Sequence, residues 1–279
     1  MSEYTRFEVR DHVGILTLSR PPVNAVCADM KAECLEVLEA VSTTRTDIWA
    51  IVICSDQKGF CGGDDTKQWM GRTPEQRERS KKLLNDLYKA LYHCNVPLIA
   101  AVNGFCVGLG MGIISLCDVV IADKDAWFQM PEVNVGTVGA PSFLTRFLPE
   151  KMARYYALTG ERIPAQEMYR LGCVLKLVEK EELLDAAMDV AKRLAAKYPP
   201  TVWAIKTMMN LTEREHCDLL DVAGRMRTLG NTRILADDPN KAEMTKAFNE
   251  HRKPVYDMAY IERAQERLKE VRAEFERKE

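Results

Sequence analysis

Short continuous apolar runs alternate along this chain with segments whose apolar residues are spaced as in a helix. The runs lie at residues 13–18, 48–53, 98–102 and 119–122. Runs of this length predict strands, and continuous ones are typical of strands covered on both faces. Apolar residues three and four positions apart predict amphipathic helices between them, beginning with residues 28–43. Strands alternating with helices are typical of βαβ units, so we predict a layered α/β core.

From about residue 142 the pattern becomes mainly helical. Residues 181–198 predict a charged amphipathic helix. The last segment, 259–279, consists largely of Glu, Lys and Arg, and such a composition predicts an exposed or frayed helix. We therefore predict a core over residues 1–200, followed by a helical region and a charged tail over residues 201–279.

Composition narrows the class of protein. The 39 Lys and Arg nearly balance the 41 Asp and Glu, which gives no bulk electrostatic reason to expect nucleic acid or a membrane surface as a partner. The nine cysteines are odd in number and show no C-x-x-C spacing, so a reduced, cytoplasmic protein is expected. The four histidines are scattered and no H-E-x-x-H motif occurs, so no metal site is expected. The N-terminus shows no signal-peptide pattern.

One uncharged stretch is long enough to cross a membrane. Residues 96–117 contain no charged side chain. Pro97, Asn103 and four glycines interrupt it, however, and such residues are typical of turns. A buried strand, a loop and a buried helix therefore explain the stretch better than a membrane span.

The first candidate for chemistry is the loop after the second strand, with the sequence GFCGGDD at residues 59–65. Adjacent glycines adopt backbone conformations closed to other residues and can expose amide N–H groups to a ligand. A tight loop without function has the same pattern, so this stretch alone decides nothing.

The second candidate is the sequence AVNGFCVGLGMG at residues 101–112, which predicts a strand, a glycine-rich turn and the start of an apolar helix. Free N–H groups at a helix start stabilise negative charge. A dinucleotide site would need G-x-G-x-x-G, but Ile113 occupies the last glycine position. No phosphate-binding G-x-x-x-x-G-K-[ST] loop occurs either, which disfavours a nicotinamide or ATP enzyme.

The third candidate is a glutamate in the sequence FQMPEV at residues 128–133. A carboxylate among apolar residues loses solvation, and its pKa rises toward values that suit proton transfer. The alternative is a surface glutamate in an ion pair.

Taken together, in this order and spacing, the three stretches resemble the crotonase (enoyl-CoA hydratase/isomerase) superfamily. Further motifs that match are VPLIAAVNG at 96–104 and CDVVIA at 117–122, and the resemblance spans roughly residues 4–256. It implies an α/β fold with a ββα-superhelix core and a C-terminal helical region that assembles trimers or dimers of trimers. It also implies an acyl-CoA substrate, with coenzyme A as part of that substrate and no other cofactor.

The resemblance also assigns roles to residues. In this family two backbone amides form an oxyanion hole for the thioester oxygen, and motif matching places them at Gly62 and Leu109. The later catalytic glutamate of the family falls on Glu132. The residues around these loops are expected to bind substrate: Cys61, Gly63, Asp64, Gly108, Gly110 and Gly112.

Departures from the family pattern decide which reaction to expect. Gly112 stands where hydratases have their earlier catalytic glutamate, and Leu109 replaces a glycine. The segment from Met130 to Arg146 is similar to subgroups that handle bulky or cyclic CoA thioesters, including steroid-ring-opening hydrolases. We expect hydratase or dehydratase chemistry with one glutamate. C–C bond hydrolysis, double-bond isomerisation and non-catalytic binding of CoA esters are the alternatives.

Overall fold

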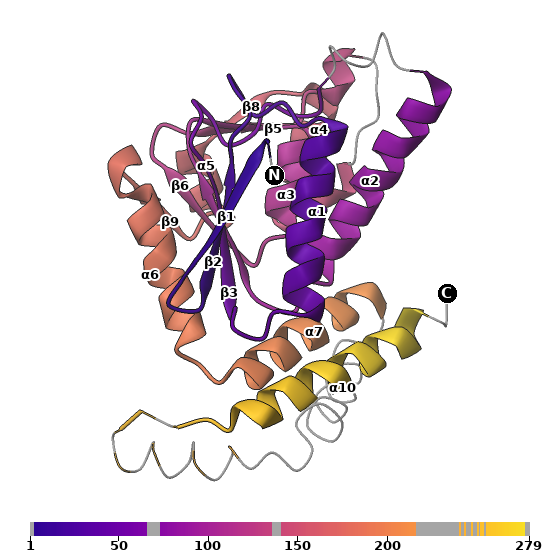
Figure 1. Ribbon diagram of the computed structural model, residues 1–279. Helices are drawn as coiled ribbons and strands as arrows, with labels where there is room; N and C mark the ends of the chain where they lie inside the picture. Colours follow the sequence, from indigo (N-terminus) through magenta and orange to yellow (C-terminus); the bar gives the residue numbers. More distant parts are fainter. Residues whose placement is uncertain are drawn as a thin grey trace. The chain divides into compact units, whose positions relative to one another are not determined.

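The computed structural model describes residues 3–65, 73–135, 141–215, 240, 243, 247, 250, 252–253 and 255–276 of the chain (Figure 1). These residues belong to two compact units, Met1–Leu194 and Ala195–Glu279. The sequence pattern placed the change from core to C-terminal helices at residue 200/201. The structure places it between Leu194 and Ala195.

A six-stranded sheet with the order β1-β2-β3-β4-β6-β9 forms the centre of the first unit. β1 and β2 are antiparallel, and all the other neighbouring strands run parallel. The strands are β1 (Thr5–Arg10), β2 (Val13–Leu18), β3 (Ala50–Ser55), β4 (Leu98–Val102), β6 (Val119–Asp123) and β9 (Lys176–Val178). Every residue of β4 is buried, and β3 is exposed only in part at Ser55. The predicted α/β core with strands covered on both faces is confirmed.

A second, three-stranded sheet has the order β5-β7-β8. β5 (Phe105–Val107) runs parallel to β7 (Trp127–Gln129), which runs antiparallel to β8 (Arg162–Pro164). The apolar pattern did not predict these strands as such, because three residues are too few to show a period. The sheet places the glycine-rich turn after β5 beside the strand that precedes Glu132.

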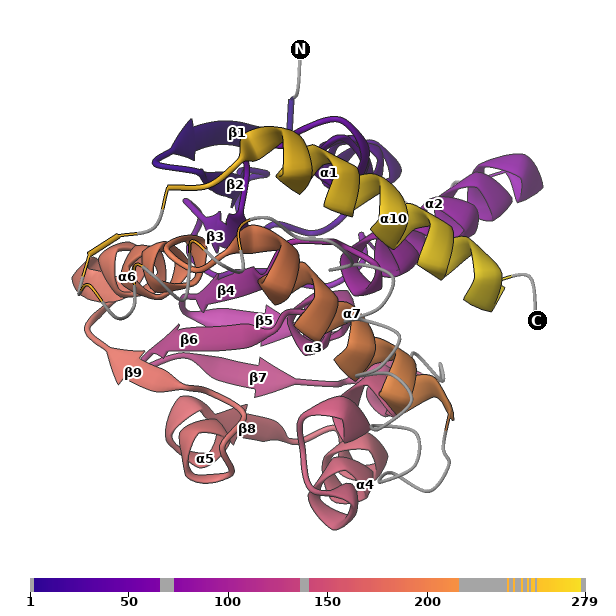
Figure 2. The ribbon, with the colours of Figure 1, turned by 90° about the horizontal axis from the view of Figure 1, so that it is seen from below.

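Helices cover both sides of the six-stranded sheet (Figure 1). α1 and α2 lie side by side, as both views show (Figure 2), and α6 lies across the sheet from them. The helices are α1 (Ala28–Thr43), α2 (Pro74–Tyr92), α3 (Leu109–Ser115), α4 (Glu150–Thr159), α5 (Ala165–Arg170) and α6 (Leu183–Ala195). Short 3-10 helices are η2 (Glu132–Val135), η3 (Pro141–Arg146) and η4 (Lys180–Glu182).

The uncharged stretch at 96–117 contains β4 and α3, the predicted buried strand and helix, and β5 lies in the part between them where a loop was expected. Gly104 and Gly108 have positive φ values of 59° and 53°, which only glycine adopts readily. Within the described part of the chain, no helix combines the length and the apolar character that a membrane crossing requires.

The second unit contains α7 (Pro199–Glu215) and α10 (Met258–Glu276), which pack against each other. The tail forms a helix as expected, but the helix is exposed on one face only. α10 buries a stripe of residues at helical spacing: Tyr260, Ile261, Ala264, Leu268 and Val271. A helix with so few apolar residues still forms a continuous buried face when those residues recur every three or four positions.

Candidate active site

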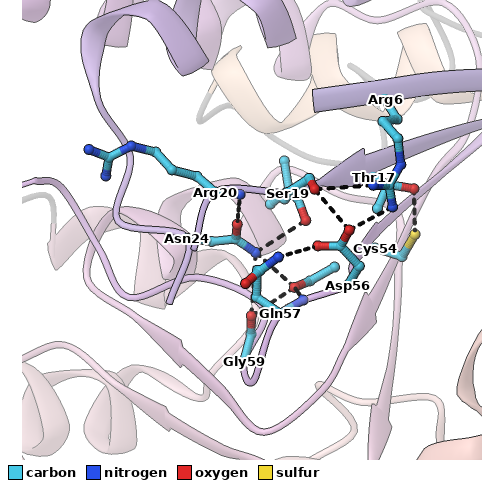
Figure 3. A network of polar contacts seen from close by, with 11 residues as sticks. Arg6, Thr17, Ser19, Arg20, Asn24, Cys54, Asp56, Gln57 and Gly59 are labelled. Carbon is cyan, nitrogen blue, oxygen red and sulfur yellow. Dashed lines mark hydrogen bonds and ion pairs between the residues drawn. The ribbon is translucent and has the colours of Figure 1, made fainter. Parts of the chain in front are cut away.

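A buried asparagine fixes the start of the loop that follows β3. Asn24 is fully buried, with a φ of 50°, and its Nδ2 donates to Ser55 Oγ at 2.7 Å and to the Phe60 carbonyl at 3.1 Å. Asp56, the first residue after β3, accepts a hydrogen bond from the Arg6 guanidinium at 2.6 Å (Figure 3). This network joins the loop after β2 to the loop after β3, so the backbone leading to the GFCGGDD sequence is held in place.

Two ion pairs hold the far end of the same loop. Lys31 of α1 donates to Asp64 Oδ1 at 2.8 Å, and Arg20 donates to Asp65 Oδ2 at 2.8 Å. Lys31 is completely buried and also donates to Ser80 of α2 at 3.1 Å. A buried ammonium group needs such partners because its desolvation is costly. The loop is thus tied to both α1 and α2.

Neighbouring peptide groups of this loop point to opposite sides. The Cys61 N–H donates to the Phe105 carbonyl of β5 at 3.2 Å, whereas the Gly62 N–H donates to the Val23 carbonyl at 2.9 Å. The expectation that the Gly62 amide faces a ligand is not met in this structure, because Val23 already accepts its hydrogen bond. Loop composition alone could not show which amide turns outward.

The amide of Asp64, two positions after Gly62, points away from the Val23–Val26 segment. Val26 and Asp64 form a parallel bridge, in which the Val26 N–H donates to the Gly63 carbonyl and the Asp65 N–H donates to the Val26 carbonyl. In such a bridge the residue opposite Val26 directs its own N–H and C=O away from Val26. The Asp64 N–H is therefore directed away from the Val23–Val26 segment, as the Cys61 N–H is.

The second loop places another amide at the start of α3. The Gly108 N–H donates to the Gln129 carbonyl at 2.9 Å, which fixes the turn against β7. The next amide, at Leu109, is the first of α3, and its N–H donates to no acceptor in the described part of the chain. The first N–H groups of a helix have no partner within the helix and can bind a ligand oxygen. This geometry agrees with the role predicted for the Leu109 amide.

Glu132 follows β7 and is half-buried. Its Oε2 is buried and has no hydrogen-bond partner among the described residues. Burial raises the pKa of the Glu132 carboxyl above its ordinary value of 4.5, and a hydrogen bond from its own backbone lowers it in part. A carboxyl group that is poorly solvated and not paired suits proton transfer better than structural support.

Both glycine loops meet at Glu132. A Cβ on Gly108 would lie 3.1 Å from Glu132 Oε1 and 3.9 Å from the Gly63 Cα. Gly63 and Gly108 also have positive φ values, 93° and 53°, so a larger residue would be strained at either position. The structure thus brings together the three stretches that the sequence singled out.

The side chain of Cys61, in the first loop, packs against Gly110 of the second loop. Its sulfur accepts a hydrogen bond from the Gly63 N–H at 3.4 Å. A Cβ on Gly110 would lie 2.7 Å from the Cys61 Cβ, so a glycine is required there. Burial raises the pKa of the Cys61 thiol to about 12, so this sulfur stays protonated at neutral pH and is no nucleophile.

Two residues of the site were missed at the sequence level, Lys31 and Tyr88. Lys31 lies next to Met30 and three positions before Cys34, so it interrupts the apolar face of α1. A lysine on a buried helix face is a signal for a buried partner. Tyr88 lies on the predominantly polar α2, and its ring lies beside Gly112, which carries no side chain. Its proximity to Gly112 depends on tertiary packing that no local pattern encodes.

A family model described as enoyl-CoA hydratase/isomerase matches residues 8–259. The chain is 33% identical over 205 residues to (7aS)-7a-methyl-1,5-dioxo-2,3,5,6,7,7a-hexahydro-1H-indene-carboxyl-CoA hydrolase of Mycobacterium tuberculosis, which covers 71% of this chain and 80% of that protein. It is 32% identical over 255 residues to (E)-benzylidenesuccinyl-CoA hydratase of Thauera aromatica, with 89% and 97% covered.

Solved structures show the same similarity. The crystal structure of an enoyl-CoA hydratase from Mycobacterium smegmatis aligns with a TM-score of 0.81 and 26% identity, and the alignment covers 91% of this chain and 99% of that one. The predicted fold is confirmed by this match.

Proposed function

The chain belongs to the enoyl-CoA hydratase/isomerase family, and from this premise we propose that it adds water across the double bond of an enoyl-CoA thioester with Glu132 as its acid/base. The observation that carries the proposal is the convergence of Gly63, Gly108 and a half-buried Glu132 whose Oε2 has no partner among the described residues. Such a site can bind a thioester and move one proton beside it.

The thioester oxygen is held by two backbone amides in this proposal. One is the Leu109 N–H at the start of α3. The other is the Asp64 N–H rather than that of Gly62, since the Val26–Asp64 bridge directs it away from Val26 while Gly62 donates to Val23. A donor aimed at a developing oxyanion contributes about 2.7–4 kcal/mol to transition-state stability.

The reaction then proceeds through an enolate. Water adds to the β-carbon of the acyl group as its proton passes to the Glu132 carboxylate. The electron pair of the double bond moves to the thioester, where the amides stabilise the negative charge on oxygen. The α-carbon then takes the proton from Glu132, which restores the carboxylate, so one water has been added.

Hydrolysis of a carbon–carbon bond is the second candidate reaction. It is favoured by the 33% identity to a hydrolase of a bicyclic CoA ester and by the lack of a side chain at Gly112, where hydratases have a second glutamate. In this reaction water adds to a β-carbonyl carbon with Glu132 as base. The bond between the α- and β-carbons breaks, and the same enolate is released and protonated.

A screen in ¹⁸O-labelled water separates the two reactions. The probes are crotonyl-CoA, cinnamoyl-CoA and 2-oxocyclohexanecarboxyl-CoA, followed by mass spectrometry. We expect an enoyl-CoA to gain one labelled water as a β-hydroxyacyl-CoA. Label in a new carboxylate of a ring-opened product would instead establish C–C hydrolysis. Failure of calorimetry to detect acetoacetyl-CoA binding at millimolar concentration would contradict the proposal as a whole.

The proposal includes a homo-oligomer, as a trimer or a dimer of trimers, that acts in the cytoplasm without a metal, flavin or nicotinamide and without nucleic acid or a membrane as partner. Ile205 and Met209, one turn apart on α7, are 56% and 68% exposed, and such apolar patches favour association. The eight cysteines in the described part of the chain form no disulfide, which suits a reducing compartment.

Light scattering tests the assembly. We expect a species of at least three chains, because α7 exposes apolar side chains that a second chain can cover. A single species of 31.7 kDa would contradict this part of the proposal.

A further inference from the structure

The space beside Gly112 is filled by a tyrosine from another helix. A Cβ on Gly112 would lie 2.5 Å from Tyr88 Oη, 2.8 Å from its Cζ and 2.9 Å from its Cε1. The polar end of the Tyr88 ring therefore occupies the place where a side chain at position 112 would begin. The phenol of Tyr88 can lie here because Gly112 has no side chain.

Tyr88 and Glu132 both lie beside the start of α3. Gly108 and Gly112 are one helical turn apart, and the Gly112 N–H donates to the Gly108 carbonyl at 3.4 Å. Gly108 directly precedes α3 and its carbonyl closes the first turn of the helix, so the two glycines lie within one turn of each other. Glu132 Oε1 lies beside the first glycine and Tyr88 Oη beside the second, so the two oxygens flank one site.

Neither polar group has a hydrogen-bond partner in the part of the chain that the structure describes. Tyr88 is half-buried, and its hydroxyl makes no hydrogen bond to a described residue, whereas Glu132 Oε2 is buried without one. A buried carboxylate oxygen is normally hydrogen-bonded, so its lack of such a partner beside the Tyr88 hydroxyl indicates a place for a polar ligand. Packing fixes the Tyr88 ring instead, because it meets the Phe143 ring edge-on at 4.6 Å between centroids.

The phenol stays protonated at neutral pH. Burial raises the pKa of Tyr88 well above its ordinary value of 10.0, and the nearby groups of Cys61, Asp64 and Glu132 raise it further. A neutral phenol is a hydrogen-bond donor, whereas the ionised Glu132 carboxylate only accepts. The two groups can therefore bind one oxygen atom from opposite sides with complementary roles.

We propose that Tyr88 is a second catalytic residue, whose O–H donates a hydrogen bond to the oxygen on the β-carbon of the acyl group, across from Glu132. The proposal rests on the proposed function and names its β-oxygen site. In hydration that oxygen is the attacking water, which loses its proton to Glu132 while Tyr88 holds it. In C–C hydrolysis it is the β-carbonyl oxygen, whose negative charge the phenol stabilises as water adds. The Tyr88 proton is not consumed in either reaction.

Two CoA esters that differ only at the β-carbon test this role without turnover. Acetoacetyl-CoA has a β-oxygen and butanoyl-CoA does not, and calorimetry measures the affinity for both. Tyr88→Phe removes the hydroxyl and keeps the ring that packs on Phe143. We expect it to weaken acetoacetyl-CoA binding about threefold to tenfold, the size of one hydrogen bond, and to leave butanoyl-CoA within about twofold.

Tyr155→Phe is the matched control, because the hydroxyl of Tyr155, on α4, donates to the exposed Glu161 and its removal should affect neither ligand. Tyr88→Leu provides a second variant. The affinity for acetoacetyl-CoA divided by that for butanoyl-CoA is measured on one preparation of each protein, and this ratio should fall in both Tyr88 variants. An unchanged ratio in the Tyr88 variants would overturn the role of Tyr88. Failure of the wild-type protein to bind either ester would instead contradict the proposed function.

Discussion

Replacement of Glu132 by glutamine is expected to lower turnover of the substrate found in the labelled-water screen by about 10²–10⁴-fold, the usual contribution of a placed acid/base. Glutamine keeps the size and polarity of the side chain but cannot carry the proton. The backbone amides that bind the thioester are unchanged, so the affinity for acetoacetyl-CoA should remain within a factor of about three. Steady-state kinetics and calorimetry on the same preparation measure the two quantities.

The difference in folding stability between the wild type and the Glu132→Gln variant is expected to depend on pH. Burial raises the pKa of Glu132 in the folded protein above 4.5, so the folded state binds this proton more tightly than the unfolded state does. The wild type therefore loses stability, relative to the variant, as the pH rises from about 4.5 through the raised pKa. At neutral pH the variant should melt no lower than the wild type. This control separates a loss of catalysis from a loss of fold.

A loss of turnover below about tenfold would contradict the assignment of Glu132, since a sole acid/base contributes more than that. Asp64 is then the first alternative because it lies in the first amide loop. Its carboxylate, however, accepts a hydrogen bond from Lys31 at 2.8 Å, which suits a structural role better than proton transfer.

Asp64→Asn is expected to destabilise the protein by about 3–5 kcal/mol, the cost of leaving one member of a buried ion pair without its partner. Lys31 is completely buried, so its ammonium group cannot turn to water when the carboxylate is removed. Urea unfolding measures the change in the free energy of unfolding. The double variant Lys31→Met/Asp64→Asn removes both charges and should be more stable than Asp64→Asn alone.

The exposed pair of Lys82 and Asp86 on α2 is the matched control. It has the same chemistry at 2.5 Å, but the Lys82 side chain is 75% exposed. Asp86→Asn should cost less than about 1 kcal/mol, because exposed pairs contribute little. Equal effects of Asp64→Asn and Asp86→Asn would show that the Lys31–Asp64 pair does not stabilise the fold.

The buried strands could be predicted from the sequence because their side chains carry the information. β4 is apolar throughout and buried throughout. β1 has mostly exposed or half-exposed residues, so it contains no apolar run from which a strand could be predicted. Its pairing with β2 makes it a strand. In α10 the burial could not be predicted, because its many charged residues outnumber the apolar residues of the buried stripe, such as Ile261 and Leu268.

The candidate site divides in the same way. The sequence motifs were enough to predict Glu132, Gly63 and Gly108, because each lies in a stretch that resembles a family motif. The structure brings the three residues together. The direction of each amide in the loop depends on hydrogen bonds to a distant segment, so the use of the Gly62 N–H by Val23 could not be predicted. Tyr88 reaches the site from α2 through tertiary packing alone.

Exchange of α-protons tests most directly the central claim that this site forms a thioester enolate with Glu132 as the base. The acyl chain of butanoyl-CoA has no carbon–carbon double bond and no β-oxygen, so only removal of its α-proton can be observed. It is incubated in D₂O with the wild type or with Glu132→Gln, and mass spectrometry follows the deuterium content. We expect exchange at the α-carbon with the wild type and a loss of at least about 10²-fold with Glu132→Gln. Equal exchange by both proteins, or no exchange by a wild type that binds butanoyl-CoA, would contradict the claim.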